Sequence, residues 1–165
     1  MKKRWYVVGL VAIVGSVIAM ALPGTSAAAR HVRVPFHAGG DLPPAVDQQT
    51  LLMKDVGTQR AAIAEASFAA WQASAAQATY AQLVVRYIDV ETLCPPAIAD
   101  WLSTPSTVDV IRGVTLLGST TTQLVFSPPL YIDKAPAGKR ACITIDASAP
   151  AGVSTFVGAS GFVIK

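Results

Sequence analysis

The sequence is poor in the residues that carry most catalytic and metal chemistry. Its 165 residues include two histidines and two cysteines. Both histidines, His31 and His37, lie in a Pro- and Gly-containing segment near the start of the chain, so a Ser-His-Asp triad, a Cys-His pair or a His-rich metal site is excluded from the rest of it. Two cysteines are too few for a zinc quartet. Gly39-Gly40 lacks the Lys-Ser/Thr pair that completes a phosphate-binding loop.

Charged residues are also scarce, at 14% against 52% hydrophobic residues. This composition excludes intrinsic disorder as a description of the whole chain. The net charge of +3 comes from Lys2, Lys3 and Arg4, because the other ten basic residues equal the ten acidic residues in number. The chain therefore lacks the electrostatic footprint of a nucleic-acid-binding protein, and we expect no nucleic-acid partner.

The carboxylates give no sign of a catalytic acid/base pair. Asp89 and Glu91 are two residues apart and would point to different faces of a helix. The other candidates fall on separate expected elements: Asp100, Asp109, Asp133 and Asp146. Acid/base chemistry needs groups positioned within reach of the same substrate. We therefore expect a non-enzymatic protein without a cofactor, and a small secreted enzyme is the alternative.

The first 28 residues are typical of an export signal. Basic residues at positions 2–4 precede an uncharged run of 18 residues, Trp5–Leu22, and a helix-breaking proline and small residues follow. We expect residues 1–28 to be either a signal peptide cleaved after Ala28 or a signal anchor, since the run is long for a cleaved signal. In both cases the rest of the chain is periplasmic or otherwise extracytoplasmic. Membrane contact would come only through an uncleaved N-terminal segment, anchored in the inner membrane.

Cleavage after Ala28 would leave His31 as the third residue of the mature chain. An amino terminus of this kind can bind Cu(II) or Ni(II) through square-planar nitrogen ligands. Some residue must stand third in every chain, however, so we assign no metal site.

The two cysteines, Cys94 and Cys142, predict one disulfide, because an even pair in an exported protein folds in an oxidising compartment. Their separation is 48 residues, for which the chain-entropy model gives a stabilisation of about 4 kcal/mol. Two buried free thiols are the alternative.

The rest of the chain divides into a linker and one domain. Residues 29–47 carry prolines and glycines with little periodicity, so an extended linker is expected there. From Thr58 to Leu93 there is neither Gly nor Pro, and alanine and glutamine are frequent, which predicts one long helix that ends at Pro95. We therefore expect a single α+β domain over residues 48–165.

After Pro105 the pattern changes to β-branched alternation, as in Val108/Val110, Leu124/Phe126 and Ile143/Ile145. Gly118 to Thr121 and Gly158 to Gly161 fit hairpin connections. A helix followed by strands is the α+β order. The predicted fold is a long N-terminal helix packed on an antiparallel sheet of four to five strands, with the disulfide joining the end of the helix to the strand near Ile143.

One face of the expected helix carries few charges. Small residues and a strip of glutamines make this face suitable for close approach of another chain. We predict Ala73 and Gln77 as partner-contact residues on it.

An apolar N-terminal segment, an Ala-rich helix ending in ATYAQLVVRYIDVETLC (Ala78 to Cys94), a strand-rich remainder and the Cys94/Cys142 pair together resemble the type IV pilin family and the accessory proteins of type IVb pilus assembly. The resemblance covers Thr58 to Lys165 and implies a pilin-like fold and other envelope or pilus proteins as partners. It leads us to expect an exported, non-enzymatic accessory or structural component of a type IV-like pilus or envelope assembly that acts through protein-protein contacts. The alternative is a periplasmic or secreted binding module unrelated to pili.

Overall fold

The computed structural model describes residues 32–42, 48–74, 76–96 and 100–165. The chain divides into two compact units, Met1–Arg30 and His31–Lys165, and all described residues belong to the second. The predicted export signal, residues 1–28, lies outside the described residues. Among the described residues, no helix is long and apolar enough to cross a membrane.

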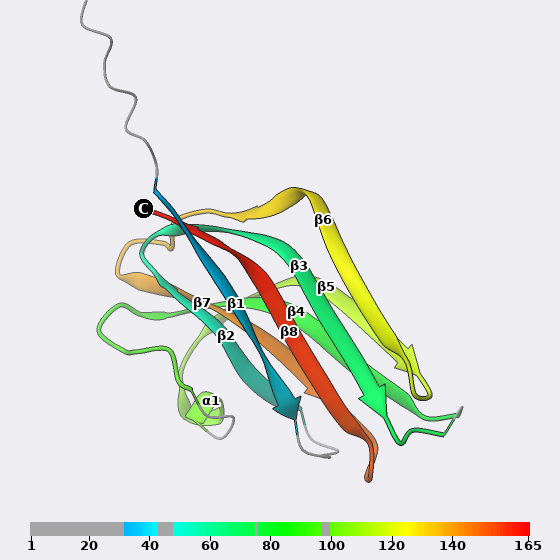
Figure 1. Cartoon of the computed structure of the whole chain (residues 1–165). Helices are drawn as coiled ribbons and strands as arrows, with labels where there is room; N and C mark the ends of the chain where they lie inside the picture. Colours follow the sequence, from blue (N-terminus) through cyan, green and yellow to red (C-terminus); the bar gives the residue numbers. More distant parts are fainter. Residues whose placement is uncertain (1–31, 43–47, 75, 97–99) are drawn as a thin grey trace, which may run out of the picture. The chain divides into compact units, whose positions relative to one another are not determined.

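The second unit is a sandwich of two antiparallel sheets (Figure 1). Its strands are β1 (Arg33–Leu42), β2 (Gln49–Gly57), β3 (Arg60–Trp71), β4 (Ala78–Asp89), β5 (Thr107–Leu117), β6 (Thr121–Ile132), β7 (Lys139–Ser148) and β8 (Ser154–Ile164), with one short helix, α1 (Asp100–Ser103). Sheet A has the strand order β1-β8-β3-β6, and sheet B has the order β2-β7-β4-β5. The predicted α+β fold is therefore wrong: the described part of the chain is all-β apart from α1.

The expected long helix is replaced by two strands, β3 and β4, which belong to different sheets. In β3 the side chains that pack in the core follow a period of about two, with a bulge between Ile63 and Glu65 that keeps the core residues in phase. In β4, Ala81, Leu83 and Val85 alternate in the same way. Alanine's helix propensity is a weak preference, and packing between two neighbouring strands overrides it here.

The core lies between the two sheets. Its largest fully buried side chains there include Phe68, Ile63, Leu83, Ile143 and Ile145. A second, smaller cluster of Ile88, Cys94, Trp101 and Cys142 lies apart from this core. The disulfide and α1 thus cover part of the outer face of sheet B.

The segment expected to be an extended linker, residues 29–47, contains an edge strand of sheet A. Strand β1 pairs with β8 from Arg33–Ile164 to Leu42–Thr155. Pro35 is tolerated because an edge strand has unpaired backbone positions. Gly39 is needed for close packing, since a Cβ there would lie 2.9 Å from the Val157 carbonyl oxygen. The linker interpretation is wrong for these residues because their alternation was hidden by glycine and proline.

The strands expected after Pro105 are confirmed at Val108/Val110, Leu124/Phe126 and Ile143/Ile145, which lie in β5, β6 and β7. The turn expected at Gly118 to Thr121 is present, but it is not a hairpin, because it joins β5 of sheet B to β6 of sheet A and these strands do not pair. The hairpin expected at Gly158–Gly161 is wrong. Both glycines lie inside β8, and a Cβ at Gly161 would collide with the Ala62 carbonyl oxygen of β3.

Candidate functional site

The disulfide predicted from the cysteine count is confirmed: Cys94 and Cys142 are bonded, with their Cα atoms 5.9 Å apart. It joins the segment after β4 to β7, and the segment beyond Cys94 leads to α1. Trp101 of α1 is 5% exposed and packs in the same cluster as the disulfide. The disulfide therefore fixes a polypeptide layer over the outer face of sheet B.

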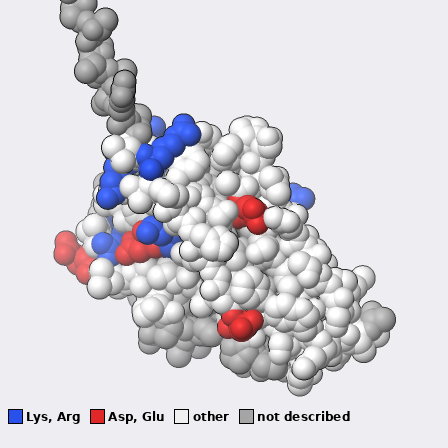
Figure 2. Space-filling model, viewed as in Figure 1, with Lys and Arg blue, Asp and Glu red and all other residues white. Residues whose placement is uncertain are grey.

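Charged side chains gather at one end of the sandwich. At this end β1 begins and β8 ends, and three ion pairs lie there: Arg60–Asp133, Lys139–Asp89 and Arg140–Asp55. Figure 2 shows most of the Lys and Arg atoms at the upper left, where Figure 1 places the C-terminus. We call this the charged end.

At the opposite end, the loops 72–77, 118–120 and 149–153 contain no Asp, Glu, Lys or Arg, while Asp41 of β1 is exposed near the start of β8. We call these three loops the uncharged end. It corresponds to the lower right of Figure 2, which is mostly white. Loops without charged side chains form a surface where desolvation costs little.

The predicted partner-contact residues, Ala73 and Gln77, both lie in the β3–β4 loop of the uncharged end rather than on a helix. The Ala73 backbone N–H donates to Ser119 Oγ at 3.1 Å, and the same hydroxyl donates to the Ala73 carbonyl at 3.2 Å. The Gln77 side-chain oxygen accepts from the Ser74 N–H at 2.7 Å, and its carbonyl accepts from the Gly118 N–H at 2.9 Å. The structure thus brings the two residues into one loop and fastens that loop to the β5–β6 connection, which joins the two sheets.

Two large apolar side chains border the uncharged end. Trp71 is 43% exposed and Leu117 is 62% exposed. The Trp71 ring packs against Phe156, with ring centroids 6.3 Å apart. Gln72, which follows Trp71, has φ 63° and is the only non-glycine residue with a positive φ among those described. Backbone strain of this kind is concentrated at functional sites.

A second candidate site is a cluster of polar side chains on the outer face of sheet B. Asp146 of β7 is paired in register with Gln82 of β4. Arg86 lies four residues after Gln82, on the same face of β4. Asp146 Oδ2 accepts hydrogen bonds from Arg86 at 2.5 Å, from Gln48 at 2.6 Å and from Gln82 at 3.3 Å. The Asp146 side chain is 1% exposed, and that of Arg86 is 12% exposed. We call these four residues the Asp146 cluster.

The Asp146 cluster lines a cavity of about 310 Å³ together with Thr50, Trp101 and Val108. The guanidinium of Arg86 lies 5.5 Å from the centre of the Trp101 ring. Three of the residues that line the cavity each have a buried polar atom with no hydrogen-bond partner among the described residues: Asp146 Oδ1, Arg86 Nε and Trp101 Nε1. The sequence analysis missed this grouping because it placed Gln82 and Arg86 on a helix, and only the β4–β7 register brings them to Asp146.

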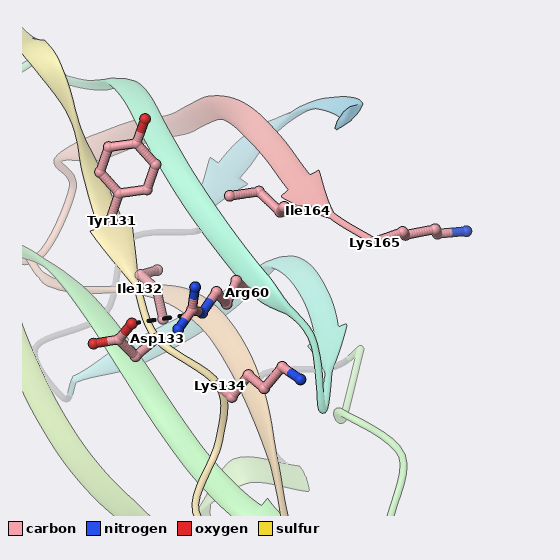
Figure 3. A pocket seen from close by; sticks show the side chains of 7 residues that line it. All are labelled: Arg60, Tyr131, Ile132, Asp133, Lys134, Ile164 and Lys165. Atoms are coloured by element: carbon pink, nitrogen blue, oxygen red, sulfur yellow. Dashed lines mark ion pairs between the residues drawn. The ribbon is translucent and has the colours of Figure 1, made fainter. Parts of the chain in front are cut away.

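A larger cavity of about 570 Å³ lies at the charged end and is lined by Arg60, Tyr131, Ile132, Asp133, Lys134, Ile164 and Lys165 (Figure 3). The Arg60 and Asp133 side chains are 56% and 92% exposed, and their ion pair is 3.8 Å long. Exposed pairs of this kind contribute little free energy. The cavity is a solvated depression, and we assign no ligand to it.

Tyr87 is the described residue whose pKa is clearly displaced. Burial raises the pKa of Tyr87 above its ordinary value, and the negative charge of Asp109, which accepts a hydrogen bond from the phenol, raises it further. A raised folded-state pKa gives stabilisation that is fully present below the unfolded-state pKa and is lost as the pH rises through the folded-state value.

We therefore expect the free energy of unfolding to fall as the pH rises above about 10, and to fall less in Tyr87→Phe. Urea unfolding on both sides of this pH measures the difference. Tyr131→Phe, at an exposed tyrosine, is the control and should keep the wild-type pH dependence. Equal pH dependence in wild type and Tyr87→Phe would contradict the prediction.

Among the described residues, no group of three or more His, Cys, Asp or Glu side chains could hold a metal ion. His37 lies on β1, and His31 lies outside the described residues.

Comparison with known proteins gives little information. No family model matches the chain, and no curated protein matches it. Among solved structures, it is similar to the CBM22-1–GH10 modules of Clostridium thermocellum xylanase 10B, solved in complex with xylohexaose, with 14% sequence identity and a TM-score of 0.37. The match covers 81% of this chain and 28% of the xylanase chain. A likeness at this level supports no conclusion about ligand or activity.

Proposed function

We propose that this protein is an exported, non-enzymatic binding module that acts in the cell envelope through protein-protein contacts made by its uncharged end. The observation that carries the proposal is the lack of charge in three adjacent loops bordered by exposed Trp71 and Leu117. Interface cores are depleted in charged residues and enriched in aromatic ones, and tryptophan is frequent among residues that dominate binding energy.

The loops are also held in place before any partner binds. Hydrogen bonds between the β5–β6 connection and Ala73 and Gln77 hold these two residues of the β3–β4 loop, so less conformational entropy is lost on association. The positive φ of Gln72 is consistent with a loop shaped for contact.

An extracytoplasmic location is part of the proposal. The Cys94–Cys142 disulfide is typical of proteins that fold in an oxidising compartment, and the export signal expected at residues 1–28 agrees with it. The buried carboxylate of Asp146 is held by Arg86 rather than beside a second acid, which favours a binding protein over a hydrolase.

In its described residues, the structure does not contain the long helix on which the resemblance to pilins was based. The resemblance to pilins depended on a long helix over Thr58 to Leu93, and β3 and β4 occupy that range. We therefore propose an envelope partner without assigning the protein to a pilus.

Site-specific photocrosslinking in intact cells tests the proposal. A crosslinking residue at Leu117 should give a discrete adduct with one other envelope protein, whereas the same residue at Val125 should not. Val125 is a matched control because it is 69% exposed and lies on β6, away from the three loops.

Trp71→Ala should reduce the Leu117 adduct at least about tenfold, since loss of a central aromatic contact costs 2 kcal/mol or more, to order of magnitude. Substituting lysine at the predicted contact residues Ala73 and Gln77 would be harder to interpret. Ala73 packs against the core and the Gln77 side chain accepts a hydrogen bond within the loop, so these changes would also alter folding. Equal crosslinking at Leu117 and Val125 would reject the uncharged end as the contact surface.

A further inference from the structure

The Asp146 cluster carries an inference that is independent of the uncharged end. Buried polar atoms in folded proteins are nearly always hydrogen-bonded, and an unpaired one costs about 1–3 kcal/mol. Here one carboxylate oxygen of Asp146 accepts three hydrogen bonds while the other, Oδ1, has none among the described residues. Arg86 Nε and Trp101 Nε1 are unpaired buried donors of two residues that line the same cavity. Other buried atoms among the described residues are unpaired as well, but here three residues that line one cavity each carry such an atom.

We propose that this cavity on the outer face of sheet B binds a neutral, hydroxyl-rich small molecule such as a saccharide. A cation would pair with Asp146 but would be repelled by Arg86 and would leave the donors unpaired. An anion would satisfy the donors but would be repelled by the carboxylate of Asp146. A hydroxyl group both donates and accepts, so neighbouring hydroxyls on one molecule can serve Asp146, Arg86 and Trp101 together.

Displacement of the Gln48 side chain would open access to the Asp146 carboxylate. Gln48 is an exposed residue whose amide reaches across to Asp146 Oδ2 at 2.6 Å. A ligand hydroxyl that donates to Asp146 replaces this amide with an equivalent hydrogen bond, so the exchange costs little. The cavity of about 310 Å³ is at the lower end of the range of small-ligand sites, which suits a mono- or disaccharide.

An aromatic side chain lies next to the cluster on the same face of β4. Tyr80 is 45% exposed and donates a hydrogen bond to Gln82 Oε1 at 3.1 Å. It lies over Gly113, where a Cβ would be 2.9 Å from the Tyr80 hydroxyl oxygen. Gly113 thus leaves room for the hydroxyl end of the Tyr80 ring, and an exposed ring offers an apolar platform beside polar groups. The C–H groups of a sugar can pack on the Tyr80 ring while its hydroxyl groups form hydrogen bonds with the Asp146 cluster.

Isothermal titration calorimetry of the purified full chain with maltose, cellobiose and lactose tests the proposal. At least one of these neutral disaccharides should bind saturably, and Gln82→Ala should weaken its binding about tenfold. Gln123→Ala is the matched control, because Gln123 also makes an exposed side-chain hydrogen bond, at 2.7 Å to Glu65, but on sheet A. Its affinity should equal that of wild type.

Three results would overturn the proposal. The first is no saturable binding of any of the three sugars. The second is an equal effect of Gln82→Ala and Gln123→Ala. The third is a high-resolution crystal soaked in the sugar that shows only ordered water on Asp146 Oδ1. None of these results bears on the Leu117 crosslink, so the two binding surfaces are tested separately. If Gln82→Ala does not fold, Tyr80→Ala, at an exposed position, serves the same purpose.

Discussion

Replacing both Cys94 and Cys142 by alanine should lower the free energy of unfolding by about 4 kcal/mol. The disulfide closes a loop of 48 residues in the unfolded chain, and its loss restores the conformational entropy of that loop. In addition, Cys142 is fully buried and Cys94 is 6% exposed, so the substitution also removes packing around Trp101. A loss of this size is a large fraction of the net stability of an ordinary domain.

Urea unfolding of the double variant and of the wild type measures this effect. Wild type unfolded in the presence of a reductant should approach the midpoint of the double variant, because reduction removes the same loop constraint. A difference below about 1 kcal/mol between the oxidised wild type and the variant would show that the loop is already restricted in the unfolded state.

The disulfide could be predicted from sequence because it depends on counting and on compartment, not on secondary structure. Cys94 and Cys142 are bonded whether the chain before Cys94 is a helix or a strand. The later strands could also be predicted from the sequence, because Ile143 and Ile145 are β-branched and alternate with other residues that face the opposite side.

The prediction of a long helix was wrong for a physical reason that is visible in β3. Ala61, Ile63 and Ala66 pack in the core between the sheets, and Ala62, on the opposite face, is also fully buried because it is small and lies between residues of β8 and β6. A strand whose small outward-facing residues are also buried shows little polar alternation, and frequent alanine is typical of a helix. Only the non-local pairing distinguishes the two structures, and a single sequence does not contain it.

The Asp146 cluster could not be found for the same reason. Gln48, Gln82, Arg86 and Asp146 are up to 98 residues apart, and each is unremarkable in its own segment. Their meeting requires the register in which Gln82 lies opposite Asp146 on one side and Thr50 lies opposite it on the other. A prediction that treats β3 and β4 as one helix contains no pairing between β4 and β7, so it cannot place these residues together.

Arg86→Met should lower the free energy of unfolding by about 3–5 kcal/mol, because it leaves the carboxylate of Asp146 buried without its counter-ion. The Asp146 side chain is 1% exposed, so its carboxylate has little contact with bulk water to offset the loss of the guanidinium. Gln48 and Gln82 still donate to Oδ2, but two amides do not supply a positive charge. Urea denaturation at neutral pH measures the loss.

Lys139→Met is the matched control for this prediction. Lys139 and Asp89 form an ion pair at 2.7 Å, but their side chains are 38% and 71% exposed. Exposed pairs contribute about 0–1 kcal/mol, so this variant should stay close to wild type. Equal losses in Arg86→Met and Lys139→Met would contradict the view that burial makes the Arg86–Asp146 pair costly to break.

The double variant Arg86→Met/Asp146→Leu separates the cost of an unpaired charge from the net value of the pair. Replacing a buried ion pair by apolar side chains of similar volume is often neutral or stabilising. We therefore expect the double variant to recover much of the stability lost in Arg86→Met, giving a coupling energy of several kcal/mol in the thermodynamic cycle. Such recovery would mean that folding does not require the pair. The Asp146 cluster would then be retained for what its cavity binds, and the recovered double variant, folded but without the polar cavity, should fail to bind the disaccharides that the wild type binds.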